Sequence, residues 1–155
     1  MQKKTHKKGM LMALIPAVLG VVLWYVVWRI GFIPAFVAFV IVYGMHWFYG
    51  KWGGRISKKE FAQVMALAVL FIVVAFLIGF VADTWSYYAL MQGGDGGFFS
   101  ADFWQTVGSQ LSHISGYIKD LGLTILFTIF AIISLAYDKK RRSQEKKIDE
   151  IAEKM

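Results

Sequence analysis

The sequence contains no cysteine, which excludes disulfide bonds, thiolate metal sites and a cysteine nucleophile. Only two prolines interrupt its 155 residues, and acidic side chains are outnumbered by basic ones, 10 against 17. Hydrophobic residues make up 57% of the chain and aromatic residues 17%, more than a soluble domain of this size usually carries. The composition therefore indicates a single-domain membrane protein.

The chain also lacks a recognisable catalytic or metal-binding constellation. It has no HExxH or GxSxG motif and no pair of carboxylates within an apolar run. Its three histidines lie in three different segments, which argues against zinc ligation; they are His6, His46 and His113. We therefore expect no catalytic residues, no cofactor site, no metal site and no enzyme activity.

Long apolar runs are the main feature of the chain. The run at 61–82 has no charged residue, and at about 1.5 Å per helical residue it spans about 33 Å, enough to cross a hydrocarbon layer of ~30 Å. Backbone groups in lipid must be hydrogen-bonded within the segment, which requires an α-helix. Together with three further apolar runs, this one predicts an all-α integral membrane protein with four transmembrane helices, at about 9–28, 32–50, 61–82 and 118–137.

Basic residues flank these runs. Fifteen of the seventeen cations lie in the segments 1–8, 51–60 and 138–155, whereas 83–120 carries a net charge of −3. Positive charge retains loops in the cytoplasm, so the pattern predicts a multi-pass plasma-membrane protein with both termini inside and 83–117 outside. It argues against a nucleic-acid partner. The tail is expected to bind anionic lipid headgroups through Lys139, Lys140, Arg141 and Arg142.

Local signals predict where helices start and bend. Pro16 lies inside the first run, four residues before Gly20, so a kink or local loosening is expected there. Ser57 and Glu60 have the spacing of a capping box. Ser100 is expected to cap an outer amphipathic helix that continues to about residue 118. This helix would lie on the outer leaflet or pack over the mouth of the bundle.

Small and aromatic residues suggest how the helices pack. Small residues recur at four-residue spacing, which lets helix backbones approach closely; the pairs are Ala13 and Ala17, Gly31 and Ala35, Ala62 and Ala66, and Ala75 and Gly79. Aromatic residues cluster at the ends of the runs, where rings favour the headgroup layer. Those at the outer ends include Trp24, Tyr25, Trp28, Trp85, Tyr87 and Tyr88.

Two polar sites are candidates for a specific role. Arg29 lies in the minimal turn between the first two runs, Asp83 follows the third and Asp120 precedes the fourth. We hypothesise that Arg29 pairs with Asp83 or Asp120; alternatively each group is separately solvated. His46 falls near the inner boundary, where we expect a neutral imidazole hydrogen-bonded among aromatic neighbours, the alternative being gating or proton relay.

Two stretches carry a resemblance to known proteins. The first is a hairpin of a small-residue helix, an Ile-Pro turn and a second helix that ends in an aromatic-rich glycine connector: LIPAVLGVVLWYVVWRIGFIPAFVAFVIVYGMHWFYGKWGGRISKKE. The second is IKDLGLTILFTIF (118–130), which follows an acidic amphipathic segment. In these features the chain resembles a group of functionally uncharacterised small four-span membrane proteins of Gram-positive bacteria. The resemblance implies a four-helix fold and no activity.

The combination of contact surfaces without a chemical centre predicts a role in association. We expect an accessory or assembly subunit of a membrane complex, whose partners are membrane lipids and either other membrane subunits or further copies of itself. The alternative is a homo-oligomeric transporter or pore for a small or lipid-like solute, which broken helices at Pro16, Gly20 and Gly44 would favour. The lack of an ionisable residue in the middle of any run argues against transport.

Overall fold

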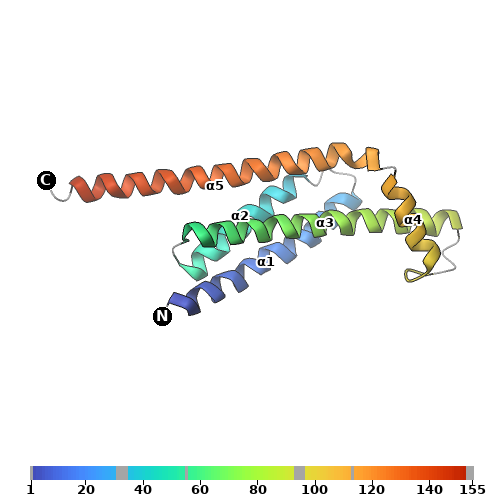
Figure 1. The fold of residues 1–155 in the computed structure, drawn as a ribbon, viewed down its shortest axis with the longest axis horizontal. Coiled ribbons are helices and arrows are strands. Elements are labelled where there is room, and N and C mark those ends of the chain that lie inside the picture. Colours follow the sequence, from blue (N-terminus) through green and yellow to red (C-terminus); the bar gives the residue numbers. More distant parts are fainter. Residues whose placement is uncertain (1, 31–34, 55, 93–96, 113, 153–155) are drawn as a thin grey trace.

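A computed structural model describes residues 2–30, 35–54, 56–92, 97–112 and 114–152, and these fold into helices. The elements are α1 (Gln2–Arg29), α2 (Ala35–Gly53), α3 (Lys58–Gln92), α4 (Ala101–Ser112), a 3-10 turn η1 (Ile114–Tyr117) and α5 (Ile118–Ala152). Four long helices, α1, α2, α3 and α5, form the bundle, and α4 lies across the C-terminal end of α3 (Figure 1). The predicted all-helical fold is confirmed.

Three helical stretches are long and apolar enough to cross a membrane, namely His6–Arg29, Lys58–Met91 and Ile118–Arg141. They confirm the membrane-spanning character predicted for three of the four runs. By the same standard of length and composition, α2 is not among them. Its second half carries His46, Lys51 and weakly apolar aromatic residues. The predicted count of four spans is therefore not confirmed.

The helix that is absent from these three stretches is the most central of the four long helices. α2 packs against α1, α3 and α5. Its buried residues are Ala35, Val37, Ala38, Ile41, Val42, Met45 and Tyr49. All of them except Ala35 form one hydrophobic core with Ala13, Ala17 and Trp24 of α1, and the core continues onto α3 and α5. The buried face of α2 is thereby covered by three neighbouring helices, while Trp47, Lys51 and Trp52 near its C-terminal end are exposed.

The backbones of α1 and α2 come closest where two glycines meet. A Cβ added to Gly9 would lie 2.6 Å from the Cα of Gly53 and 3.2 Å from the ring of Tyr49. Real Cβ atoms do not approach backbone atoms so closely. Glycine is therefore required at position 9 by the contact between the two helices.

The predicted helix breaks in α1 and α2 are instead contact points. Both helices continue without interruption, α1 through Pro16 and α2 through Gly44. A Cβ on Gly44 would lie 2.9 Å from the Cβ of Pro16, and one on Gly20 would overlap the side chain of Ile41. The small size of these residues allows the two helices to pack closely. The helix breaks expected from the sequence are not observed in the described residues of α1 and α2.

Two predicted helix starts agree with the structure. The Ser57 N–H donates to Glu60 Oε2 at 2.8 Å and the Glu60 N–H donates to Ser57 Oγ at 3.2 Å, which confirms the capping box. α2 ends at Gly53, and Gly54 has a φ of +81°, the left-handed conformation common after a helix. Ser100 Oγ accepts a 3.2 Å hydrogen bond from the Phe103 N–H, so it caps α4 as expected.

Two helices extend beyond the apolar runs that predicted them. α3 continues ten residues past position 82, and α5 continues through much of the basic tail. The extension of α3 supports α4, because Phe103 and Val107 are buried against Phe80 and Tyr88. Of the two placements that the sequence left open, α4 therefore packs on the bundle. It ends at Ser112, earlier than expected, where the chain turns into η1.

Some of the small and aromatic residues singled out in the sequence are buried, and others are exposed. The pairs Ala13 and Ala17, and Ala75 and Gly79, are buried as expected, whereas Ala62 and Ala66 are exposed. Trp24 and Tyr88, predicted to lie in the headgroup layer, are buried among other helices, while Tyr25 and Tyr87 are exposed. Two positions used in the sequence predictions, Gly31 and His113, lie outside the described residues.

Replacing Gly9 by alanine is expected to lower the free energy of unfolding by about 1–3 kcal/mol, because the added methyl group meets backbone that cannot rotate away. Gly122→Ala is the matched control, since nothing lies within 4 Å of a Cβ at that position and alanine favours helix. Unfolding in mild detergent, followed by circular dichroism, gives the comparison. Equal stability of the two variants would contradict the contact.

Candidate functional site

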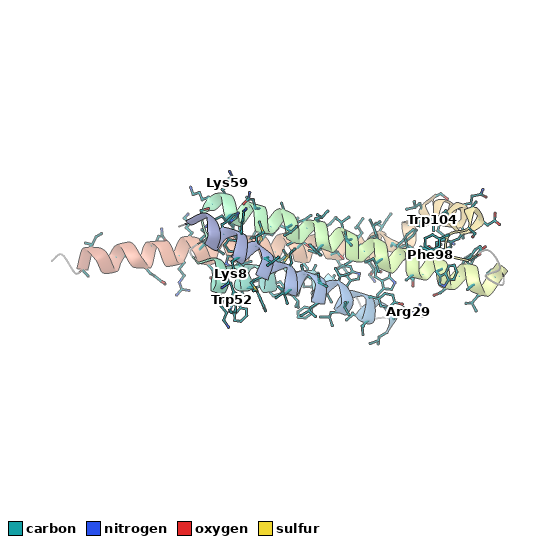
Figure 2. The ribbon with its side chains drawn as sticks, turned by 90° about the horizontal axis from the view of Figure 1, so that it is seen from below. Lys8, Arg29, Trp52, Lys59, Phe98 and Trp104 are labelled. Carbon is teal, nitrogen blue, oxygen red and sulfur yellow. The ribbon has the colours of Figure 1, made fainter. Side chains whose placement is uncertain are left out.

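The three basic segments meet at one end of the bundle. The Lys8 ammonium lies over the Trp52 ring and the Lys139 ammonium over the Phe61 ring, each 5.2 Å from the ring centroid. Figure 2 shows Lys8, Trp52 and Lys59 at the end opposite Arg29. The charge asymmetry along the chain therefore becomes a charge asymmetry between the two ends of the molecule. We call these the basic end and the outer end.

A polar cluster joins α1, α2 and α3 at the basic end. Nδ1 of His6 lies 2.6 Å from the Tyr49 hydroxyl oxygen and 3.3 Å from Glu60 Oε1. Tyr49 is fully buried, whereas His6 and Glu60 are half-exposed. Sequence reasoning missed this cluster because its members come from three helices, although the capping box had already placed Glu60 at the start of α3.

The chemistry of this cluster is that of a junction between helices. The single His6 ring contacts both the Tyr49 hydroxyl of α2 and the Glu60 carboxylate of α3 through Nδ1. The described residues include no group of three histidine, aspartate or glutamate side chains able to hold a metal ion. The cluster therefore supplies a charge-assisted link between helices.

His46 lies beside an aromatic side chain of a neighbouring helix. Its ring meets the Phe61 ring of α3 edge-on, with centroids 5.7 Å apart. Of the aromatic neighbours expected around it, the Tyr43 hydroxyl oxygen lies 2.6 Å from Ser134 Oγ of α5, and Trp47 is exposed. His46 therefore contributes an aromatic contact between α2 and α3.

At the outer end, the groups predicted to pair with one another have other partners. Arg29 Nη1 donates to Ser86 Oγ at 3.1 Å, and Asp83 Oδ2 accepts a 2.7 Å hydrogen bond from Trp28 Nε1. Among the described residues, the ion pairs within 4.0 Å are His6–Glu60 and Arg141–Glu145, so neither Asp83 nor Asp120 pairs with Arg29. α1 is thus tied to α3 at Asp83 through Trp28, and the hypothesised pairing of Arg29 with Asp83 or Asp120 is not observed in the described part of the chain.

The packing of the Trp28 ring explains why Trp28 is the side chain that binds Asp83. The ring stacks on Tyr117 with centroids 5.9 Å apart, and a Cβ on Gly79 would lie 2.9 Å from it. With the ring flat against α3, the indole N–H reaches Asp83. Burial raises the pKa of the Tyr117 hydroxyl, and the charge of Asp83, a hydrogen bond to it and the charge of Asp120 raise it further. Trp28 therefore connects α1, α3 and η1.

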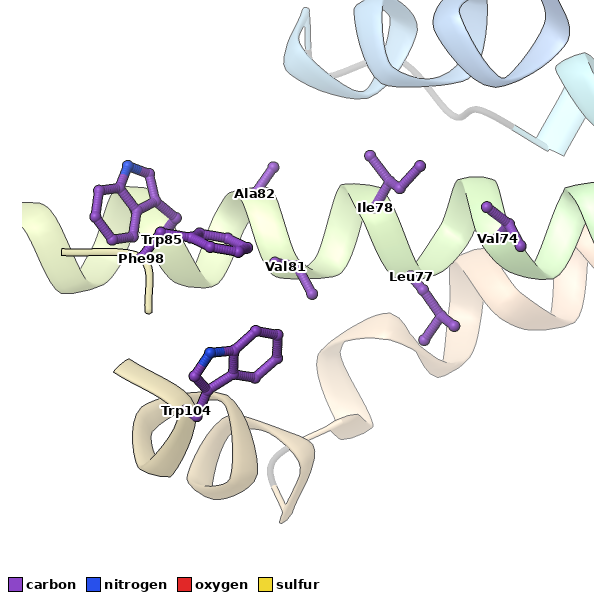
Figure 3. A pocket seen from close by; sticks show the side chains of 8 residues that line it. All are labelled: Val74, Leu77, Ile78, Val81, Ala82, Trp85, Phe98 and Trp104. Atoms are coloured by element: carbon purple, nitrogen blue, oxygen red, sulfur yellow. The ribbon is translucent and has the colours of Figure 1, made fainter. Parts of the chain in front are cut away.

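An apolar cavity of about 530 Å³ lies between α3 and α4. Figure 3 shows its lining, which consists of Val74, Leu77, Ile78, Val81, Ala82, Trp85, Phe98 and Trp104. Its volume falls in the range of ligand pockets, roughly 300–1,000 Å³, but the lining offers no acid, base or nucleophile. It is suited to hold an apolar group. The sequence did not indicate it, because the lining comes from both sides of the α3–α4 connection.

The predicted lipid-binding tail is a helical continuation of α5. Lys139 is half-buried, Lys140 and Arg141 are exposed, and Arg141 Nε donates to Glu145 Oε1 at 2.9 Å. Arg142 belongs to the same helix. Figure 1 shows this part of α5 projecting past the other helices. Only the first turn of the tail therefore lies beside the rest of the bundle.

The geometry as a whole is that of a helical membrane protein with a polar junction at each end and an apolar cavity at one of them. The chain matches no protein-family model, no curated protein and no solved structure. The resemblance to four-span proteins of Gram-positive bacteria stays a hypothesis, and function has to be argued from the surfaces of the molecule.

A double-mutant cycle on Trp28→Phe and Asp83→Ala is expected to give a coupling energy of about 1–2 kcal/mol, because the bond from the indole N–H to the carboxylate is charge-assisted. Thermal unfolding in detergent provides the measurement. The matched cycle combines Arg29→Gln with Asp83→Ala and should show little coupling. Stronger coupling of Asp83 to Arg29 than to Trp28 would contradict the observed partners.

Proposed function

We propose that this protein is an accessory or assembly subunit of a complex in the bacterial plasma membrane, and that it crosses the membrane four times with both termini in the cytoplasm. The gathering of the basic segments at one end supports this topology, since positive charge is retained on the cytoplasmic side. The central position of α2 supports its role as a span, because its buried face packs against α1, α3 and α5.

The observation that carries the subunit role is the projecting part of α5. Residues 138–152 extend the helix by about 22 Å, and an isolated helix of this length is marginal in water. Ile148 and Ile151 are 65% and 61% exposed. A second protein that covers these side chains would stabilise the helix, which makes the tip of α5 the proposed docking surface.

The straight course of α5 divides the tail between two kinds of partner. Lys139, Lys140 and Arg141 occupy the first turn beyond the apolar run, at the level where lipid phosphates would lie. Ile148 and Ile151 are two to three turns farther along the helix axis, away from the membrane surface. We therefore assign lipid contact to the base of the tail and protein contact to its tip.

The exposed side of α5 provides a second contact surface within the membrane. Leu126, Ile129 and Ile133 are more than half exposed, and nothing lies within 4 Å of a Cβ on Gly122. These four positions share one face of the helix. A glycine without a neighbour on an apolar helix face suits close approach by another helix, from a foreign subunit or a second copy.

A homo-oligomeric transporter or pore for a lipid-like solute is the second candidate, and the apolar cavity is the observation in its favour. The buried hydroxyls do not provide a polar path for a small solute. Those of Thr84, Thr124 and Thr128 each donate to a carbonyl of their own helix. We therefore rank transport below association.

Single cysteines in this cysteine-free chain test the topology. A cysteine at Lys59 should be protected from an impermeant thiol reagent in intact cells, and one at Gln105 on α4 should be labelled, because the two positions lie at opposite ends of the bundle. Permeabilised cells provide the control for reactivity. Labelling of the Lys59→Cys variant from outside would contradict the proposed orientation.

The subunit role predicts that the full-length protein, purified in mild detergent, retains a foreign membrane protein in stoichiometric amount. Ile148→Glu should release it, because a charge then enters the apolar contact. Gln144→Glu introduces the same charge one turn away at an exposed polar position and should retain it. A lone oligomer that carries solute into liposomes would contradict the subunit role and support the second candidate.

A further inference from the structure

The cavity between α3 and α4 is elongated and open toward the surroundings of the bundle. Its lining follows α3 from Val74 to Trp85, which is about 16 Å of helix. Leu77 and Trp104 are 49% and 47% exposed, so the lining is accessible from the surroundings of the bundle. In a membrane this opening faces lipid. The long axis of the cavity is parallel to α3 and therefore roughly parallel to the lipid chains.

The chemistry of the lining favours a lipid chain as the occupant. All eight lining residues have aliphatic or aromatic side chains and none is charged. An acyl chain is apolar along its whole length, so it can be buried there without leaving a polar group unpaired. The volume of about 530 Å³ lies within the range of pockets that hold small ligands, roughly 300–1,000 Å³.

A cation lies at the outer rim of the cavity. Ser86 Oγ donates to the carbonyl of Ala82 at 3.0 Å and accepts from Arg29 Nη1 at 3.1 Å. Because Ala82 lines the cavity, the guanidinium lies one helical turn beyond it. Arg29 is exposed and has no carboxylate within 4.0 Å in the described part of the chain, while Asp83 is engaged by Trp28.

We propose that this site binds an anionic phospholipid, with one acyl chain in the cavity and the phosphate on Arg29. Guanidinium N–H groups match phosphate oxygens and form charge-assisted hydrogen bonds with them. A zwitterionic headgroup would bring a second cation toward Arg29, so an anionic headgroup is preferred. The site requires that the part of α3 from Val74 to Trp85 lies in the outer leaflet with Arg29 at headgroup level, but it does not depend on the subunit role.

The test is native mass spectrometry of the full-length protein in mild detergent, titrated with phosphatidylglycerol and, separately, with phosphatidylcholine. We expect one tightly bound phosphatidylglycerol per chain. Ile78→Trp should weaken its binding by about tenfold, because the indole fills the cavity. Arg29→Gln should also weaken it by about tenfold, the loss expected for one charge-assisted hydrogen bond, and should remove the preference over phosphatidylcholine.

Two control variants separate this site from general lipid contact. Leu70→Trp places an indole on the same face of α3 one turn before the cavity, where Leu70 is already exposed, and Lys119→Gln removes another cation at the outer end. Both should bind phosphatidylglycerol like the unaltered protein. Ala82→Leu is a second cavity-filling variant, to be used if Ile78→Trp does not fold.

Several outcomes would overturn the proposal. Unchanged binding in the cavity-filling variant would show that the chain lies elsewhere, and unchanged binding in Arg29→Gln would exclude the headgroup contact. An equal loss in Leu70→Trp would mean that the lipid is part of the general lipid layer. Because lipid binding is measured on the isolated protein, failure to find a partner for the tip of α5 does not affect the result.

Discussion

The close packing of α1 on α2 is the contact on which the rest of the structure depends. α2 is the helix that touches each of α1, α3 and α5, and α1 reaches it through Gly9 and the small residues that follow at similar spacing. Packed interiors do not absorb a displacement of one methyl group without shifting their neighbours. A wider separation would move Tyr49 of α2 away from His6 of α1.

Both ends of the bundle use the same chemical device to join helices. At the outer end an indole N–H donates to Asp83, and at the basic end a tyrosine hydroxyl lies against the His6–Glu60 pair. Aromatic side chains with a polar tip suit the ends of apolar helices, because the ring is buried while the tip reaches a polar group. Asp83 therefore joins helices at the outer end, and Glu60 joins helices at the basic end.

Two of the surfaces that take no part in these junctions differ in chemistry. The tip of α5 is a polar helix with two exposed isoleucines, which suits a protein partner in water. The cavity beside α4 is apolar with Arg29 at its rim, which suits a lipid. A subunit with both surfaces would connect a partner in the cytoplasm with the lipid composition of the opposite leaflet.

The sequence by itself determined the helices, their caps and the segregation of charge. The Ser57–Glu60 capping box and the Ser100 cap were predictable because each involves residues three apart along the chain. Helix lengths were less predictable, since hydropathy reports where a helix is apolar and α3 and α5 continue into polar sequence. Which side chains meet across helices was decided by the tertiary structure alone. Successive residues point about 100° apart around a helix, so the rotation of α1 decides whether Trp28 or Arg29 reaches Asp83. The cavity likewise exists only because α4 folds back on α3, a placement that no local pattern in the chain specifies.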